Sequence, residues 1–570
     1  MRWLDLLSAL PVSMCLACSG SAPRVAPTGE PPMPETAASD FADLVLRARR
    51  VVTLDEVLDR RPRPPEALAI RDGRIVWVGA RAEADRFVGP STRVVDAPGG
   101  TVVPGLVDAH AHLTSLGRSL SEPDLSTARS VDEAIERLRA AVPEGDGWIE
   151  GRGWDQNDWP GGEFPKHDAL TAAFPQRPVA LRRVDGHALW VNATAMARAG
   201  IDRTTPDPAG GRVVRDAAGA PTGVLVDTAM DLVTRQIPPP DGATVTRWLK
   251  AAVAACHRVG LTGVHDAGAS AASVSALEAM AASGDLALRT FVLLDADDPT
   301  NAARLEAGPV RGPWLTIGGV KLFADGALGS RGAWLSAPYS DAPETKGLPI
   351  VHGDVLAARV RTYAERGFQL GVHAIGDAAA TDVLDAYAGV LTPGNDRRFR
   401  LEHAQIVRPE DRVRMASLGV LALVQPTHAT SDMPWAEKRL GAERIRWAYA
   451  WRSLKTAGVR LVLGSDFPVE KPDVLDGLAA AVTRQDAQGQ PEGGWYPEEA
   501  LSAWEALWGF TAEPAYAAFV EAHRGRIAVG FDADLTVLGG DPLAVPGSAL
   551  RGLTVLYTLV GGRVVYGPSP

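Results

Sequence analysis

The feature that most constrains the fold is a regular alternation of apolar runs with helical stretches through the middle of the chain. Eight runs have the length and residue types of buried β-strands, and stretches rich in Ala, Arg and Glu lie between them. Parallel strands joined by crossover helices produce this pattern, so we predict an α/β fold with a (β/α)₈ barrel over residues 101–524. The expected strands are residues 101–112, 260–268, 287–295, 316–326, 367–377, 399–405, 419–428 and 459–468.

The two ends of the chain have a different residue pattern, in which apolar and polar residues alternate as in half-buried strands. Asp72-Gly73 and Gly561-Gly562 are hairpin signals, one near each end. Because both ends are β-rich and the middle is not, we predict that residues 41–100 and 525–570 come together as one small β-domain.

One interval between expected strands is too long for an ordinary crossover. About 150 residues separate the first two strands, whereas most connections in a compact domain are far shorter. The interval has strand-like pieces of its own, such as GWIEGRGWD and PVALRRVDGHALWV. We therefore predict an inserted subdomain over residues 115–258. It follows strand one, on the face of a barrel where catalytic residues gather.

The first residues, MRWLDLLSALPVSMCLACSG, are similar to a bacterial lipoprotein signal, with Cys18 as the lipidated residue. Asp5 departs from that pattern, and an ordinary apolar N-terminus or a misassigned start are the alternatives. We expect residues 1–18 to be a signal peptide and residues 19–40, rich in Pro, Ala and Ser, to be a disordered tether. The expected location is the bacterial periplasm or cell envelope, with the membrane reached only through a lipid anchor at Cys18. The apolar run is too short for a stable transmembrane helix.

Charge and cysteine content narrow the classes of function. The formal net charge is −11, and we find no basic run of the length that nucleic-acid-binding arms use, so no nucleic-acid partner is expected. Beyond the leader the only cysteine is Cys256, which excludes a disulfide framework in the mature chain. The expected partner is a small-molecule substrate.

Metal-ligating side chains recur at the C-terminal ends of the expected strands, which in a barrel face one mouth. His110 and His112 alternate at the end of strand one, so both side chains point to the same side. His373 ends strand five, His403 ends strand six, and Asp466 ends strand eight. Imidazoles and a carboxylate are good ligands for zinc, and their recurrence predicts a divalent-metal centre. Taken singly, each has a structural alternative, such as a hydrogen-bonded core histidine or an aspartate that caps a helix.

Lys321 raises a separate question, because it lies inside the apolar run Gly-Val-Lys-Leu-Phe-Ala of strand four. A lysine is almost never fully buried unless it is paired, and burial lowers the pKa of a bare ammonium. The alternative is a lysine that reaches solvent or an acidic partner.

Seven motifs follow one another along the chain: PGLVDAHAHL (104–113), GWDQNDWP (153–160), RRVDGHALWVN (182–192), GGVKLFADGALGSRGAWL (318–335), VHAIGD (372–377), LEHAQ (401–405) and LGSDFPVE (463–470). On these motifs the chain resembles the amidohydrolase superfamily. Within it, the chain is most similar to the branch called amidohydrolase family 3, which includes N-substituted formamide deformylase. With the two β-rich ends, the resemblance covers essentially all of residues 43–567.

The resemblance implies a metal-bearing barrel and a β-sandwich built from both termini. It places His110 and His112 on one metal and His373 and His403 on a second. It makes Asp466 a ligand of the first metal and the general base. It further implies two Zn²⁺ ions bridged by Lys321 after carboxylation by CO₂; with one metal only, this lysine would be a plain ammonium near the substrate. Members of the superfamily often dimerise, so a homodimer is a candidate assembly, although the sequence carries no interface signature.

The implied reaction is hydrolysis of a carbon–nitrogen bond other than a peptide bond, in an amide, N-formyl or N-acyl amine, by metal-activated water. His187 is a candidate to hydrogen-bond the carbonyl oxygen, with a structural turn as its alternative. Candidates for the substrate wall, with packing or local ion pairs as alternatives, are Trp154, Asp155, Trp159, Asp325, Arg331 and His428. His265 is a candidate to support the metal ligands from behind. The same site could instead hydrolyse an ester or lactone or deaminate a ring substrate, and a lipoprotein that binds a ligand without turnover is a further alternative.

Overall fold

The computed structural model describes residues 41–55, 59, 64–141 and 145–568. The predicted signal peptide, Cys18 and the tether fall within residues 1–40, outside the described residues, so export and lipidation stay predictions. Within the described ranges, no helix is both long enough and apolar enough to cross a membrane.

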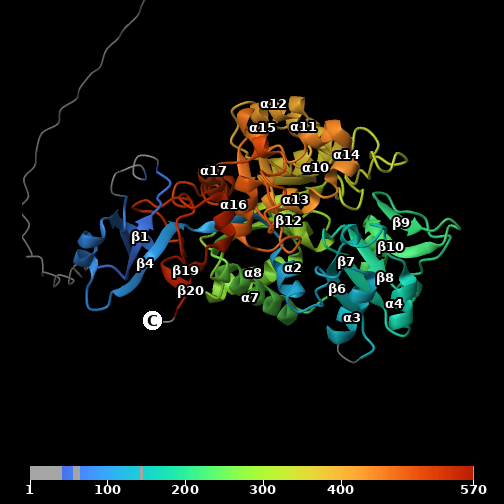
Figure 1. Cartoon of the computed structure of the whole chain (residues 1–570), viewed down its shortest axis with the longest axis horizontal. Coiled ribbons are helices and arrows are strands. Elements are labelled where there is room, and N and C mark those ends of the chain that lie inside the picture. The colour runs from blue at the N-terminus through green and yellow to red at the C-terminus, as the bar shows by residue number, and fades with distance from the viewer. Residues whose placement is uncertain (1–40, 56–58, 60–63, 142–144, 569–570) are drawn as a thin grey trace, which may run out of the picture. The chain divides into compact units, whose positions relative to one another are not determined.

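The middle of the chain forms a sheet of eight parallel strands that closes almost completely into a barrel (Figure 1). The strands lie side by side in chain order, as crossover helices between parallel strands require. They are β5 (Leu106–Ala111), β11 (Leu261–Ala269), β12 (Arg289–Asp295), β13 (Leu315–Phe323), β14 (Gln369–Ala374), β15 (Arg400–His403), β16 (Leu421–Val424) and β17 (Leu461–Leu463). This arrangement confirms the predicted (β/α)₈ fold.

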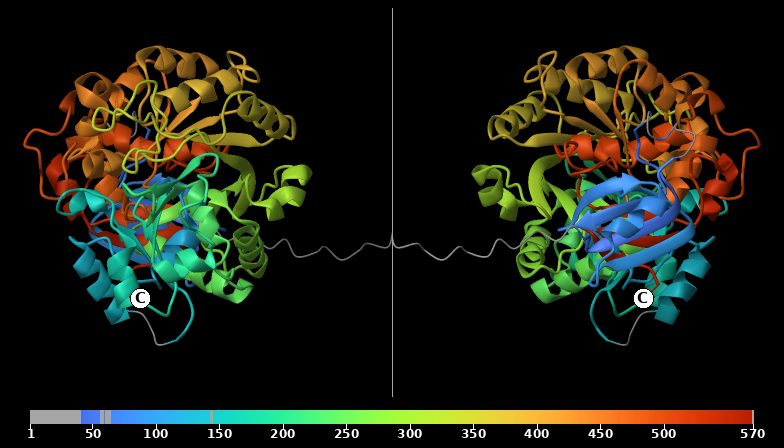
Figure 2. Two further views of the ribbon diagram at one scale, coloured as in Figure 1. Left: turned by 90° about the vertical axis from the view of Figure 1, so that its right-hand side faces the viewer. Right: turned by 90° about the vertical axis from the view of Figure 1, so that its left-hand side faces the viewer.

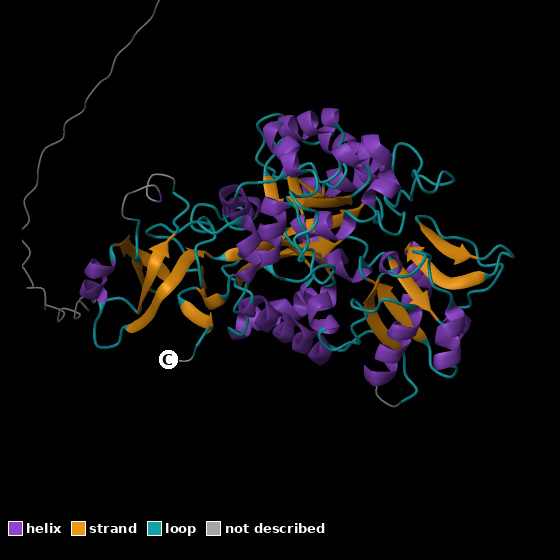
Figure 3. Ribbon diagram, in the orientation of Figure 1, coloured by secondary structure: helices purple, strands orange, loops and turns teal. Residues whose placement is uncertain are grey.

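Helices lie around these strands (Figure 3), and the apolar faces of helices and strands merge into one hydrophobic core. The helices of this region are α2 (Leu113–Ser119), α7 (Gly242–Arg258), α8 (Ala271–Ser283), α9 (Ala302–Ala307), α10 (Gly353–Glu365), α11 (Asp377–Ala388), α12 (Pro409–Leu418), α13 (Pro426–Asp432), α14 (Ala436–Arg444), α15 (Trp451–Thr456), α16 (Val474–Thr483), α17 (Ala503–Gly509) and α18 (Ala512–Ala517).

Backbone hydrogen bonds just beyond the strand ends join the first and last strands of the barrel. The amide of Asp466 donates to the carbonyl of His110 at 2.7 Å, and the amide of His112 donates to the carbonyl of Phe467 at 2.9 Å. This seam holds two of the predicted metal-binding segments in a fixed register.

The first barrel strand is shorter than predicted. Residues 101–104, expected at its start, instead end β4 (Arg93–Pro104), which belongs to the sheet made by the chain ends. Pro104 has no amide to donate to a ladder. At Gly105 a Cβ would come within 2.2 Å of the Thr262 hydroxyl, so only glycine fits there. The chain therefore leaves one sheet and enters the other at this Pro-Gly step.

A sheet of seven strands combines both ends of the chain, which lie side by side in blue and red in Figure 1. Its strands, in spatial order, are β20 (Arg563–Tyr566), β19 (Val555–Val560), β18 (Leu535–Leu538), β4, β1 (Leu44–Val51), β2 (Ala67–Arg71) and β3 (Arg74–Gly79). Alternate side chains of β1 pack into two different hydrophobic clusters, so both faces of this sheet are covered.

A third sheet follows the first barrel strand and faces the viewer in the left view of Figure 2. It contains, in spatial order, β6 (Ile149–Trp154), β7 (Val179–Arg183), β8 (Ala188–Val191), β10 (Pro221–Asp227) and β9 (Gly211–Arg215). Its helices are α3 (Val131–Ala141), α4 (His167–Ala173), α5 (Ala193–Arg198) and α6 (Asp231–Thr234). We call residues 120–241 the insert. It is shorter than the predicted range 115–258, because α7 packs its apolar face into the barrel core.

Candidate functional site

The carboxyl ends of the barrel strands open into a cavity of about 760 Å³, and the insert forms one of its walls. This volume suits a small organic molecule. The predicted site residues His187, His373, His403, His428 and Asp466 all line it. The structure thus brings to one place residues that the sequence distributes over the insert and four separate barrel strands and their loops.

His110, His112 and Asp466 form the first group of candidate metal ligands, with one ligand atom from each within 4.8 Å of the others. Nε2 of His112 lies 3.0 Å from Oδ1 of Asp466, and Nε2 of His110 lies 3.5 Å from the same oxygen. Asp466 has a φ of 62°, a conformation that a non-glycine residue adopts only where the surroundings impose it. The turn after β17 therefore aims this carboxylate at the two imidazoles.

His373 and His403 lie next to this group. Their ring centroids are 4.5 Å apart, and the rings of His403 and His110 are 4.7 Å apart. His403 and His428, with Asp466, form a second set whose ligand atoms lie within 4.8 Å of one another. The four predicted imidazoles are thus contiguous, and His428 joins them from α13.

Lys321 lies among these imidazoles, and its side chain is 1% exposed. Its Nζ is 3.4 Å from Nε2 of His110. Burial lowers the pKa of this lysine, against the opposing charges of Glu402 and Asp466. The lysine charge in turn lowers the pKa of His110, which burial and Lys321 together bring to about 4. The lowered pKa makes the neutral amine that carboxylation needs more accessible at Lys321 than in an exposed lysine.

These side chains fit a divalent metal ion. Among the described residues, Oδ1 of Asp466 and Nε2 of His428 are buried and make no hydrogen bond. Nε2 of His112 is 3.0 Å from the same Asp466 oxygen, and the ligand atoms of His110, His112 and Asp466 lie close enough together to share one ion. Imidazole nitrogens with a carboxylate oxygen are the ligand chemistry of zinc sites.

Glu402 is a central residue of the site that we did not predict from the sequence. It is fully buried, and its Oε2 is 2.5 Å from Nδ1 of His110. Its Oε1 is 2.7 Å from Nε of Arg400. Burial alone would raise the pKa of Glu402, but Arg400 and His110 lower it to about 2. The carboxylate therefore holds the proton of His110 on Nδ1 and leaves Nε2 free to bind a cation. The sequence did contain a signal for Glu402, because an acidic residue within the expected buried strand of the motif LEHAQ needs a partner.

Replacing Glu402 by glutamine is expected to weaken the binding of Zn²⁺ by about 10- to 100-fold, the usual range when the partner of a metal-binding histidine is lost. Chelator competition on the purified protein measures this affinity. Glu437→Gln, which changes an exposed side chain that bonds Tyr496, is the matched control. An unchanged zinc affinity in Glu402→Gln would contradict the role given to Glu402.

His187 reaches the cavity from the insert, as predicted for a group that contacts substrate. Its Nδ1 is 2.7 Å from Oδ1 of Asp227, and its ring lies 5.1 Å from that of His373. Burial lowers the pKa of His187, but the hydrogen bond and charge of Asp227 outweigh burial and raise it overall. The Nδ1 proton is thus fixed toward Asp227, and Nε2 is left for a ligand.

Other predicted wall residues have different positions from those expected. Trp154 and Trp159 do not line the cavity; both are buried in the core of the insert, where their indole N–H groups donate to backbone carbonyls. Arg331 also lies outside the cavity lining, because it pairs with Asp341 at 3.1 Å. For these three residues the structure shows the packing and the local ion pair that the sequence left open as alternatives.

Asp155 and Asp325, which we also predicted to contact the substrate, instead bond to other residues of the protein near the cavity. Asp155 lines the cavity and forms an ion pair with Arg183. Asp325 lies behind His373, 3.5 Å from Nε2, and accepts hydrogen bonds from the amides of Trp334, Ile375 and Gly376. Asp325 thus ties together the loops that follow β13 and β14.

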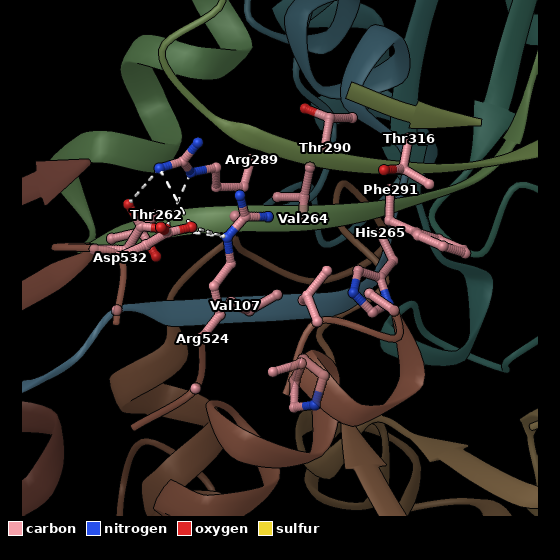
Figure 4. Close-up of a pocket in the computed structure, with 18 of the residues that line it drawn as sticks. Val107, Thr262, Val264, His265, Arg289, Thr290, Phe291, Thr316, Arg524 and Asp532 are labelled. Carbon is pink, nitrogen blue, oxygen red and sulfur yellow. Dashed lines mark hydrogen bonds and ion pairs between the residues drawn. The ribbon is translucent and has the colours of Figure 1, made fainter. Parts of the chain in front are cut away.

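A second, smaller pocket lies at the opposite end of the barrel strands (Figure 4). Arg289 and Arg524, which line it, form ion pairs with Asp534 and Asp532 at 3.0 and 2.8 Å. His265 also lines this pocket, and its Nδ1 is 3.2 Å from Nη1 of Arg400. His265 is therefore connected to the candidate metal ligand His110 through Arg400 and Glu402. In barrels, residues at this N-terminal end serve stability and those at the other end serve catalysis.

Comparison with known proteins agrees with this geometry. The sequence pattern of the family described as "Amidohydrolase family" matches residues 93–566. The Bacillus subtilis (strain 168) protein named "Putative amidohydrolase YtcJ" is 37% identical over 514 residues, which cover 88% of this chain and 96% of the relative. N-substituted formamide deformylase from Arthrobacter pascens is 31% identical over 545 residues, covering 89% of this chain and 96% of the relative.

A solved structure is similar over most of the chain. It is that of an uncharacterized metal-dependent hydrolase from Pyrococcus horikoshii OT3, with a TM-score of 0.72 and 28% identity. The match covers 88% of this chain and 99% of that chain. The full-length family match, the relatives and the histidine-rich barrel mouth lead to one conclusion: this protein is a hydrolase that belongs to the amidohydrolase family.

Proposed function

We propose that the protein hydrolyses a carbon–nitrogen bond other than a peptide bond, in an amide, N-formyl or N-acyl amine. The observation that carries this proposal is the position of the buried Asp466 carboxylate, which lines the cavity and lies against His110 and His112. His187 faces the same cavity from the insert. A base on one side and a hydrogen-bond donor on the other is the arrangement that attack of water on a carbonyl requires.

The proposed metal ligands are the four strand-end histidines and Asp466, and a carboxylated Lys321 would be shared by two zinc ions. His110 and His112 would hold one ion, and His373 and His403 the other. When bound, the metal centre supplies Lewis-acid polarisation of the carbonyl and makes water a nucleophile near neutral pH. Support for a carboxylated Lys321 comes from its burial, its lowered pKa and its position among the imidazoles.

In the proposed mechanism, the Asp466 carboxylate accepts a proton from the attacking water and then delivers it to the leaving nitrogen. The raised pKa of His187 favours its imidazolium form, in which Nε2 also carries a proton and donates a hydrogen bond to the carbonyl oxygen, whose negative charge grows as the carbon becomes tetrahedral. Asp227 keeps the imidazole of His187 oriented through Nδ1. One water is consumed, and a carboxylic acid and an amine are released.

A screen of the zinc-loaded protein tests the proposal against the alternatives. Matched N-formyl amines, N-acyl amines, esters, lactones and aminated ring compounds would be offered at equal concentrations. Release of amine from the amides, at a higher kcat/KM than for the oxygen esters, is the expected result. Preference for an ester, lactone or ring amine would assign another chemistry to the site. Binding without turnover of any compound would indicate a ligand-binding protein.

Replacing His187 by asparagine is expected to lower kcat by about 10²- to 10³-fold, the usual cost of losing a donor to the developing oxyanion. Because His187 is not among the proposed metal ligands, the zinc content should stay the same. Steady-state kinetics with parallel zinc analysis measures both. His167→Asn changes another histidine of the insert, bonded to Thr171 and absent from the cavity lining, and serves as the control. A rise in KM with unchanged kcat would contradict the proposed role.

A further inference from the structure

Arg152, on β6 of the insert, is a cavity residue that the proposed mechanism does not use. Its Nη2 donates to the carbonyl of Val184 at 3.0 Å. In the part of the chain that the structure describes, no carboxylate lies within ion-pair distance of its guanidinium. Two other arginines in the cavity lining differ in this respect: Arg183 pairs with Asp155, and Arg551 pairs with Asp476 at 3.2 Å. A guanidinium has five donors in a planar fork, so most of the donors of Arg152 are available to a ligand.

The local fold places a second positive charge beside Arg152. In the parallel pairing of β6 with β7, Arg152 is the register partner of Arg182. Like charges directly opposite on neighbouring strands are destabilising. The nearby carboxylates of Glu122 and Glu150 are both bound by Arg118. The strand pair thus keeps an unfavourable charge arrangement at the cavity wall, which an anionic ligand would relieve.

Arg152 stays cationic at neutral pH although it is half-buried. Burial, followed by the charge of Arg182, lowers the pKa of Arg152 to about 10. The carboxylates that act on it from a distance include Asp466, so the guanidinium lies near enough to the proposed base to sense its charge. An anionic group bound by Arg152 would therefore lie in the same cavity as the reacting bond.

Acidic side chains elsewhere in the lining limit where such a group can lie. Asp432 and Glu470 line the cavity from the end of α13 and the loop after β17. On the insert, Asp124 also lines it, whereas Asp155, Asp158 and Asp185 are paired with Arg183 or Arg129. An anion is disfavoured beside Asp432 and Glu470 and favoured beside Arg152. Leu120 and Val184 line the cavity on the side of the insert, and an apolar substituent fits against them.

We propose that Arg152 binds a carboxylate on the substrate, so that the protein prefers N-acylated or N-formylated compounds with a carboxylate near the scissile amide, such as N-acyl amino acids. This inference rests on the proposed amide hydrolysis and names its substrate class. Arg152 then determines specificity by a charge-assisted, bidentate hydrogen bond to the carboxylate, while the chemical step stays with Asp466 and His187.

The test compares two substrates that differ only in charge: N-formyl-leucine and N-formyl-leucinamide. For the zinc-loaded protein, kcat/KM is expected to be about 10- to 100-fold higher for the acid, the range that a hydrogen bond to a charged group contributes. Arg152→Met should remove this preference by lowering kcat/KM for the acid only. Arg152→Lys should retain part of it, because the charge remains without the planar fork.

Three further readouts make the outcomes distinct. Arg129→Met removes another cavity cation, one that is exposed and paired with Asp158, and it should leave the preference intact. Thermal unfolding of each variant detects a loss of folding. Calorimetric binding of N-formyl-leucine to wild type and to Arg152→Met tests the contact even without turnover. Equal kcat/KM for acid and amide in wild type, or equal binding of the acid by Arg152→Met, would overturn the assignment of Arg152. Failure of wild type to hydrolyse either compound would overturn the proposed amide hydrolysis instead.

Discussion

An Asp466→Asn variant is expected to lose at least about 10³-fold in kcat, within the range that a positioned general base contributes. Asparagine keeps the shape of the side chain but cannot accept the proton of the attacking water. Burial alone would raise the pKa of Asp466, yet the neighbouring His110 and His112 lower it well below its usual value. The carboxylate is therefore ionised at any pH near neutral, and the asparagine variant should stay inactive over that whole range.

Zinc analysis distinguishes loss of the base from loss of the metal site. If Asp466→Asn keeps its zinc and its thermal stability but not its turnover, the missing function is proton transfer. Asp476→Asn, which changes an acid on the cavity wall that pairs with Arg551, is the matched control and should retain most of its activity. Unchanged turnover in Asp466→Asn would contradict the proposed mechanism.

The second large effect is expected at Lys321. Lys321→Met should lower the zinc content of the protein from two ions to one and reduce kcat by about 10²-fold or more, because a proposed bridging anion and its Lewis-acid partner are lost together. Lys321→Glu should restore part of the zinc content, since its side chain supplies a carboxylate in place of the carbamate. Metal analysis and native mass spectrometry, in which the carbamate adds the mass of one CO₂, measure these changes.

Lys250→Met provides the control for Lys321, because this lysine is exposed and pairs with Asp285 on the outside of the barrel. Electron density at Lys321 is a direct check of the same prediction. Wild-type density that ends at Nζ would show a plain lysine. Together with an unchanged zinc content in Lys321→Met, it would contradict a pair of metals bridged by Lys321.

Much of the metal site could be predicted from the sequence because it depends on strand ends. His110, His373 and His403 each end or nearly end a barrel strand, and Asp466 follows one closely. In a parallel barrel all such positions face the same mouth. The prediction therefore needed only the strand positions and the direction of the chain, both of which are local features of the sequence.

Residues of the insert were harder to place. Trp154 lies in a motif beside Asp155, and the sequence alone allowed it to be a lid or part of a core. The structure shows that its indole donates to the carbonyl of Leu181 and that its ring packs 6.1 Å from that of Trp190. Residues two apart in a regular strand share a face, but the pairing of β6 with β7 shifts its register between Arg152 and Trp154, and this irregularity gives the two side chains different surroundings. That register is a long-range property, so neither the burial of the tryptophan nor the availability of the arginine could be predicted.

The sequence by itself determined the barrel, the strand ends that carry the histidines, and the family of the protein. The periodicity of apolar residues and the order of the motifs can be recognised from short stretches of the chain. Only the tertiary structure decided which acids orient those histidines and which cation is left for a substrate. Glu402 and His110 are separated by 292 positions, and their contact exists because β15 and β5 face each other across the barrel interior. Burial then makes that contact strong, since a charge removed from water must find its partner within the protein.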